Sequence, residues 1–297
     1  MRQAVLWQDA GCTIQSRRCH LTTRTDLAIC RGLKRAFTLV ELLVFIAIIV
    51  VIIGMILAVA APMRQAARRT QCLANQRQIA IACNTYSTDH YARLPSPRTD
   101  TSAPSGGAGM VFNPWVNCSV AAGTMTPAGV ELKGSLEKGV LWPYMDQSYS
   151  SFKSPLDDSK RVRSYSLNAF VGVGNINPNP GNKKADELYS FGQKTQTLGR
   201  LPQPARTMCS IGEAEANANI HGWVIKTYPD AADWIDYPAF WDGNRVNISL
   251  MDGSTESLQI LSPKLIAAIQ AFGHSYIEPF PSPSWYVMQQ YMLPGKF

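Results

Sequence analysis

Residues 42–61 read LLVFIAIIVVIIGMILAVAA, a run of twenty residues without a charged side chain. About 20 apolar residues in a helix are long enough to cross the hydrocarbon core of a bilayer. The whole chain of 297 residues is ordinary in composition, with 46% hydrophobic residues, 16% charged residues and a mean hydropathy of -0.08. This average excludes a transporter with several spans. The sequence therefore predicts one membrane span and a large polar remainder.

The positive charge is concentrated ahead of this run. Residues 1–36 carry seven Lys and Arg against two Asp, whereas the other 261 residues hold 21 basic and 19 acidic side chains. A basic flank stays on the cytoplasmic side of a membrane, so we expect a cytoplasmic N-terminus and an exported C-terminal part. Because the basic excess flanks the span, the net charge of +7 does not indicate a nucleic-acid partner, and none is expected.

The residues directly before the run carry a more specific pattern. Residues 34–43 read KRAFTLVELL, with basic residues, a small residue and then Phe-Thr-Leu-Val-Glu. This pattern resembles the class III signal of type IV prepilins and type II secretion pseudopilins. The resemblance implies that prepilin peptidase cuts between Ala36 and Phe37 and that Phe37 is then N-methylated. The family usually has Gly before the cut, where this chain has Ala36.

Glu41 stands one residue before the span and has two interpretations. In the first, its carboxylate lies at the headgroup level, where a charge costs little. In the second, it is buried and pairs with a cation of another subunit, since a buried charge is tolerated when it is paired. Cleavage before Phe37 would supply that cation, the new α-amino group. A signal peptidase I site at residues 58–60 is an alternative, although the twenty-residue apolar run exceeds the usual 7–15.

The helix is expected to continue beyond the span. Residues 63–94 contain neither Gly nor Pro, and the spacing of Cys72, Ile79, Cys83 and Tyr86 places them on one helical face. We expect one helix from Phe37 to about residue 90, bent at the proline in position 62. Residues 72–95 resemble a subgroup of planctomycete proteins that join a prepilin-type N-terminus to a larger β-rich head. The arginines of this stretch are interpreted as a solvated face, with contact to anionic lipid or nucleic acid as an alternative that nothing in the pattern favours: Arg64, Arg68, Arg69 and Arg77.

The predicted fold class is α+β, with a long N-terminal helix packed on an antiparallel sheet, as in pilins. The expected organisation is a leader (1–36), the helix (37–92, with the span at about 42–61 and a periplasmic half at 62–92) and a β-rich exported head (93–297). Apolar stretches separated by turn signals predict strands at 162–170, 206–211, 223–228 and 247–251, a type I′ hairpin turn at Asp252-Gly253, and a helix at 264–272. The aromatic C-terminal tail is expected to pack across the head.

One head motif also resembles the planctomycete subgroup. There, a His is followed by nine residues and then Asp-Gly, whereas here Asp242 stands in the His position and Asp252-Gly253 are in register. The simplest interpretation is a hairpin. The alternative is a calcium site that uses the carboxylates of Asp242 and Asp252, because Ca²⁺ prefers oxygen ligands. No other cofactor is expected.

The remaining chemistry-bearing residues indicate no enzyme. The histidines (20, 90, 221 and 274) form no catalytic triad or HExxH pattern, and Glu213 with Glu215 is interpreted as a solvated acidic pair. Cys72 and Cys83 are too far apart along a helix to bridge each other. They are interpreted as buried thiols, with pairing to Cys118 or Cys209 left open. The subgroup often has Cys where this chain has Ser154.

Together these patterns predict a structural subunit, major or minor, of a type IV pilus-like or type II secretion-like filament. The expected partners are prepilin peptidase, other pilin or pseudopilin subunits and the inner membrane. The expected location is the inner membrane, with a single span and the head in the periplasm or outside the cell within a filament. The alternative is a membrane-anchored module that binds an envelope component and does not polymerise.

Overall fold

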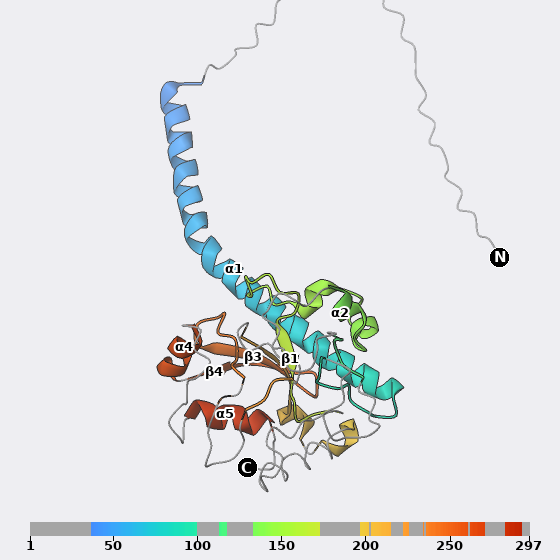
Figure 1. Ribbon diagram of the computed structural model, residues 1–297. Coiled ribbons are helices and arrows are strands. Elements are labelled where there is room, and N and C mark those ends of the chain that lie inside the picture. Colours follow the sequence, from blue (N-terminus) through green and yellow to red (C-terminus); the bar gives the residue numbers. More distant parts are fainter. Residues whose placement is uncertain are drawn as a thin grey trace, which may run out of the picture. The chain divides into compact units, whose positions relative to one another are not determined.

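The computed structural model describes residues 37–99, 113–117, 133–172, 197–201, 203–214, 222–225, 234, 236–260, 262–270 and 283–292. The chain divides into two compact units, residues 1–56 and 57–297. Helix α1 (Leu39–Asp89) is continuous from the first unit into the second and includes Pro62 (Figure 1). The single long helix predicted from the apolar run and from the spacing that follows it is therefore confirmed.

The end of α1 is defined by its backbone. Tyr91 and Ala92 adopt positive φ angles of 55° and 62°. The N–H of Ala92 donates to the carbonyl of Ser87 at 2.8 Å, which satisfies one of the free carbonyls of the last turn. Left-handed residues that are not glycine are uncommon. The helix therefore ends without the glycine that usually marks a helix C-terminus in the sequence.

The second unit contains a four-stranded sheet in the order β1-β2-β3-β4. Its strands are β1 (Tyr165–Leu167), β2 (Met208–Gly212), β3 (Arg245–Leu250) and β4 (Thr255–Gln259), and every neighbouring pair is antiparallel. The connections include a short helix, α2 (Lys133–Glu137), and four 3-10 turns, at Trp142–Tyr144, Tyr149–Phe152, Leu198–Arg200 and Pro204–Arg206. The predicted α+β class is confirmed.

The sheet lies between two helical layers. The second half of α1 runs along one face, and α5 (Pro283–Met292) lies on the other side (Figure 1). Leu265 of α4 (Pro263–Gln270) belongs to the same core as α5. Alternate residues of β3 follow this division: Val246, Ile248 and Leu250 belong to the core shared with α5, whereas the main-chain carbonyl of Asn247 accepts a hydrogen bond from Gln76 of α1 at 2.8 Å. The sheet therefore has one apolar core on each face.

The side of the core toward α1 confirms the predicted helical face. Cys72, Ile79, Cys83 and Tyr86 are all at most 3% exposed. Their partners come from α2, from the connections that precede the sheet and from its near face, among them Leu136, Trp115, Phe152 and Tyr165. The other core is built around Trp285 and Met288 of α5, so the expectation that the tail packs across the head is confirmed for residues 283–292.

The hairpin β3–β4 is confirmed, but the predicted type I′ turn is wrong. A type I′ turn needs positive φ at two successive residues, and here Gly253 has a φ of 89° while Asp252 does not. The N–H of Gly253 donates to Leu250, and the N–H of Leu250 donates to Ser254. The connection is thus a three-residue loop, residues 251–253, with glycine at its left-handed position.

The other strand predictions hold in part. The stretch 162–170 forms only the three-residue strand β1, because Asn168 accepts a hydrogen bond from the N–H of Phe170 and turns the chain. Within 223–228, Trp223 makes one isolated bridge to Asn168, and residues 226–228 lie outside the described residues. The helix predicted at 264–272 is α4.

Candidate functional site

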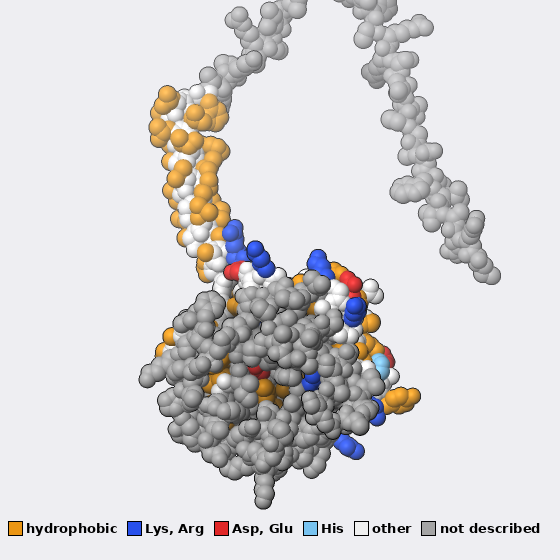
Figure 2. Space-filling view, viewed as in Figure 1, with side chains coloured by type: hydrophobic (Ala, Val, Ile, Leu, Met, Phe, Trp, Pro, Cys, Tyr) orange, Lys and Arg blue, Asp and Glu red, His pale blue; other side chains and the backbone are white. Residues whose placement is uncertain are grey.

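The first half of α1 presents an apolar surface. Figure 2 shows hydrophobic side chains along it, and its most apolar 18-residue stretch is entirely unburied within the single chain. The large apolar side chains from Phe37 to Val59 are between 37% and 78% exposed. Exposed apolar surface of this extent marks a membrane or protein contact. One helix of this length and composition near the N-terminus fits a single-pass membrane anchor.

The N-terminus of this helix is capped by Thr38 and Glu41. The carboxylate of Glu41 accepts hydrogen bonds from the Thr38 main-chain N–H at 3.0 Å and from its hydroxyl at 2.9 Å. The Thr38 hydroxyl in turn accepts from the N–H of Glu41 at 3.2 Å. This reciprocal arrangement is a capping box, which satisfies free N–H groups of the first turn and holds the Glu41 carboxylate there.

The structure thus places Phe37 and Glu41 together at the start of α1. Phe37 is 76% exposed and immediately precedes the capping residue. Ala36 and the predicted leader, residues 1–36, lie outside the described residues. The spacing Thr-x-x-Glu is a readable signal for a capping box, and sequence reasoning based on charge alone missed it.

In the head, Asp242 pairs with Arg69 of α1. Nε of Arg69 donates to one carboxylate oxygen of Asp242, and Nη2 donates to the other at 2.8 Å. The Gln65 amide adds a longer contact of 3.4 Å. The Asp242 side chain is 7% exposed and that of Arg69 is 37% exposed. The hydrogen bond from Arg69 lowers the pKa of Asp242 below its ordinary value and raises the pKa of Arg69.

This ion pair corrects the interpretation of Arg69 as part of a solvated face. Arg69 is held by a carboxylate 173 residues away in sequence, so it fixes the head to the helix. Its neighbour Arg68 fits the solvated description, because it approaches Asp158 only at 3.8 Å with both side chains more than half exposed. Exposed pairs of this kind contribute little stability.

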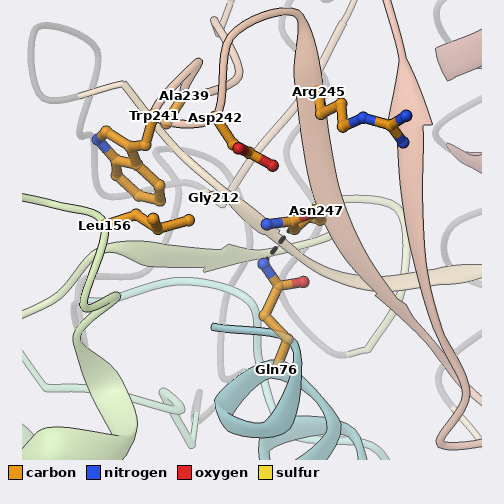
Figure 3. Close-up of a pocket in the computed structure, with 8 residues that line it drawn as sticks. All are labelled: Gln76, Leu156, Gly212, Ala239, Trp241, Asp242, Arg245 and Asn247. Atoms are coloured by element: carbon orange, nitrogen blue, oxygen red, sulfur yellow. Dashed lines mark hydrogen bonds between the residues drawn. The ribbon is translucent and has the colours of Figure 1, made fainter. Parts of the chain in front are cut away.

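Asp242 also lines a hollow between α1 and β3. Figure 3 shows Gln76 pointing from α1 toward Asn247, where it donates to the main-chain carbonyl, with Trp241 and Leu156 on the other side. The side-chain oxygens of Gln76 and Asn247 are buried and have no hydrogen-bond partner among the described residues. These oxygens are acceptors, but the hollow has no room for a water molecule and so offers no space for a ligand.

The two aspartates of the head motif are not brought together. They flank opposite ends of β3, whose six residues span about 20 Å at 3.3 Å per residue. Asp252 accepts from the N–H and the hydroxyl of Ser254, a local turn arrangement. Within the part of the chain that the structure describes, no three His, Cys, Asp or Glu side chains could hold a metal ion. The arrangement therefore does not support a calcium site shared by Asp242 and Asp252.

A second charged cluster, which sequence reasoning missed, lies inside the head. Nε of Arg161 donates to Asp157 at 2.6 Å, and Arg163 lies 3.8 Å from the Glu213 carboxylate, which also accepts from the Ser166 hydroxyl. Burial raises the pKa of Asp157, but the charge of Arg161 and several hydrogen bonds outweigh it and lower the pKa overall. Glu213 is 1% exposed, so its interpretation as part of a solvated acidic pair is wrong, and Glu215 lies outside the described residues.

The described cysteines are Cys72, Cys83 and Cys209, and all are buried free thiols. The interpretation of Cys72 and Cys83 as buried thiols is confirmed. Cys118 lies outside the described residues. Cys83 and Cys209 face each other with 3.8 Å between their sulfur atoms.

The comparisons with known proteins concern only the middle of the chain. Residues 61–171 match the model of a family described as a protein of unknown function (DUF1559), typically of planctomycete pilin-like proteins. The matched range contains the second half of α1 and strand β1 but neither Phe37, Glu41 nor Asp242. No curated protein and no solved structure gives a significant match to the chain.

Proposed function

We propose that this chain is a structural subunit of a type IV pilus-like or type II secretion-like filament. The observation that carries the proposal is the exposed apolar half of α1, which begins with a capped carboxylate at Glu41. A membrane anchor needs the apolar surface but does not need this carboxylate. The family match of the adjoining segment, residues 61–171, supports a pilin-like protein.

The proposed assembly step begins with cleavage between Ala36 and Phe37 by prepilin peptidase. Cleavage removes the basic leader and leaves an α-amino group on Phe37, which is then methylated. The apolar halves of α1 then leave the membrane and pack together, and the Glu41 carboxylate of one subunit neutralises the α-amino group of its neighbour. Pairing is required because an isolated charge in an apolar filament core is costly.

The mature N-terminus tests the processing step. Mass spectrometry of the chain isolated from its own membranes is expected to find a methylated Phe37. A retained leader, or an N-terminus near Ala61 produced by signal peptidase I, would contradict the proposal.

The role of Glu41 is tested separately from its capping role. Glu41→Gln keeps a side chain that can complete the capping box but removes the charge, whereas Thr38→Ala weakens the cap and keeps the charge. We expect Glu41→Gln to abolish filament assembly and Thr38→Ala to leave it largely intact, as measured by sedimentation of sheared filaments. If Glu41→Gln assembles like the wild type, pairing through Glu41 is wrong and the alternative of a non-polymerising anchored module gains support.

A further inference from the structure

Two cysteines that are distant in sequence meet inside the head. Cys83 on the buried face of α1 and Cys209 on β2 are 126 residues apart, and their sulfur atoms are separated by 3.8 Å. Each residue is 2% exposed. A disulfide has a sulfur–sulfur distance of about 2.05 Å, so the two sulfurs would have to approach by less than about 2 Å.

The backbone of β2 is irregular at this point. Met208 pairs with Leu250 while Ser210 pairs with Ser249, so Cys209 is an extra residue in a β-bulge. Met208 and Ile211 pack in the core shared with α5, whereas Cys209 packs in the core shared with α1. The bulge therefore turns the Cys209 side chain toward the helix, where Cys83 lies.

The surroundings leave room for the sulfurs to move. A small cavity is lined by both cysteines together with Leu94, Leu167 and Met251. Closing the bond requires a rotation of one or both side chains, and a neighbouring void lowers the packing cost of such a rotation. The cavity therefore lies directly beside the two sulfur atoms that would form the bond.

We propose that Cys83 and Cys209 are a disulfide-forming pair that locks α1 to the sheet when the chain folds in the presence of a disulfide oxidant. That the pair is oxidised in the cell rests on the proposed function, which places the head in an oxidising compartment. The ability of the pair to close does not depend on that placement.

The chemistry is thiol–disulfide exchange with an oxidised dithiol protein or a small disulfide. The thiolate of one cysteine attacks the oxidant, forms a mixed disulfide and releases one thiol of the oxidant. The second cysteine then attacks the sulfur of the first and releases the other thiol. Two thiols are oxidised to one disulfide and the oxidant is reduced to two thiols. Hydrogen bonding with Cys209 and burial raise the pKa of the Cys83 thiol, so exchange is fastest before folding buries the pair.

Cys72 provides a matched control on the same helix. It is also fully buried, but its sulfur lies 3.5 Å from the Tyr165 hydroxyl and 3.7 Å from the Asn247 amide. Among the described residues its sulfur faces polar groups and not another thiol. A serine at position 72 should therefore leave the Cys83–Cys209 bond unchanged.

The test is synthesis of the full chain in a cell-free system with detergent micelles and a glutathione redox buffer. Free thiols are alkylated, and tryptic peptides are analysed with and without reduction. Trypsin gives the peptides 78–93 and 207–226, each with a single cysteine. We expect these two peptides to be joined, with a loss of about 2 Da relative to the reduced pair. The cross-link should disappear in Cys83→Ser and persist in Cys72→Ser, and reduction should lower the melting temperature of the wild type only when the cross-link is present.

Two outcomes would overturn the inference. One is complete alkylation of both peptides in a chain that melts cooperatively, and the other is a cross-link of either peptide to a different cysteine. Alkylation of free thiols in intact cells then tests whether the head lies in an oxidising compartment. A pair that closes in micelles but is reduced in cells would contradict the exported head of the proposed function and leave the pair itself established.

Discussion

Replacing Arg69 by Met removes the cation that holds Asp242 while it keeps the aliphatic stem of the side chain. The Asp242 carboxylate then loses two hydrogen bonds, one of them at 2.8 Å, and keeps the Gln65 contact at 3.4 Å. Because its side chain is 7% exposed, water cannot fully replace the lost donors. Removing one partner of a fully buried pair costs about 3–5 kcal/mol.

The expected cost here is smaller for two reasons. Arg69 is 37% exposed, so solvent screens the pair, and the nearby charge of Arg245 also stabilises the Asp242 carboxylate. We therefore expect Arg69→Met to lower the free energy of unfolding by about 2 kcal/mol. In a unit of this size each kcal/mol corresponds to about 2–4 °C in melting temperature, so the expected decrease is about 4–8 °C.

The assay is thermal unfolding of the full chain in detergent, followed by circular dichroism. Asp242→Asn leaves the Arg69 side chain, which is 37% exposed and can reach water, so its expected cost is smaller, about 1 kcal/mol. Arg68→Met, one residue away with only an exposed contact, should shift the melting temperature by less than about 2 °C. Equal shifts for Arg69→Met and Arg68→Met would show that the Arg69–Asp242 pair does not hold the head to the helix.

Three further outcomes are expected. Because folding lowers the pKa of Asp242, the stabilisation from its charged form is present above about pH 4 and is lost as the pH falls through the folded-state pKa. The difference in melting temperature between wild type and Asp242→Asn should therefore shrink toward pH 3 and stay constant above pH 5. Gly139→Ala places a methyl group 2.2 Å from the Trp115 carbonyl oxygen and should lower the free energy of unfolding, measured in urea, by at least about 2 kcal/mol. Gly134→Ala in α2 has no atom within 4 Å of the added methyl group and should be neutral or stabilising. Trp285→Ala empties a core position that is 1% exposed and should cost about 3–5 kcal/mol, measured as a lower urea midpoint. A wild-type midpoint in that variant would mean that α5 does not pack on the sheet.

Helix α1 could be predicted from sequence because its signals are local. The charge-free run and the spacing of Cys72, Ile79, Cys83 and Tyr86 depend only on neighbouring residues. The β3–β4 hairpin was equally local, since Asp-Gly between apolar stretches marks a turn. The type of the turn could not be predicted from local signals. It depends on which residue takes the positive φ when the hairpin tip packs near α1.

The contacts between distant segments could not be predicted in the same way. Arg69 carries no sign in sequence of which of the 21 acidic residues it meets. The bulge at Cys209 follows from the register of β2 against β3, which a single strand does not encode. Arg163 lies in the predicted strand 162–170 and Arg161 directly precedes it. Only their burial beside Asp157 and Glu213 gives them a structural role.

The second half of α1 is attached to the head by amide side chains as well as by apolar ones. Asn75 donates to the carbonyls of Ser150 and Lys153 at 3.0 and 2.9 Å, Gln76 donates to Asn247, and Asn84 donates to the carbonyl of Met251 at 2.9 Å. Sliding the helix by one turn would leave these donors buried without acceptors, at about 1–3 kcal/mol each, whereas apolar side chains alone would tolerate the shift.

The amide contacts therefore fix the register of the helix against the head. Under the proposed function this register matters more than added stability. Subunits that pack through the first half of α1 can place their heads reproducibly only if each head is fixed along its own helix.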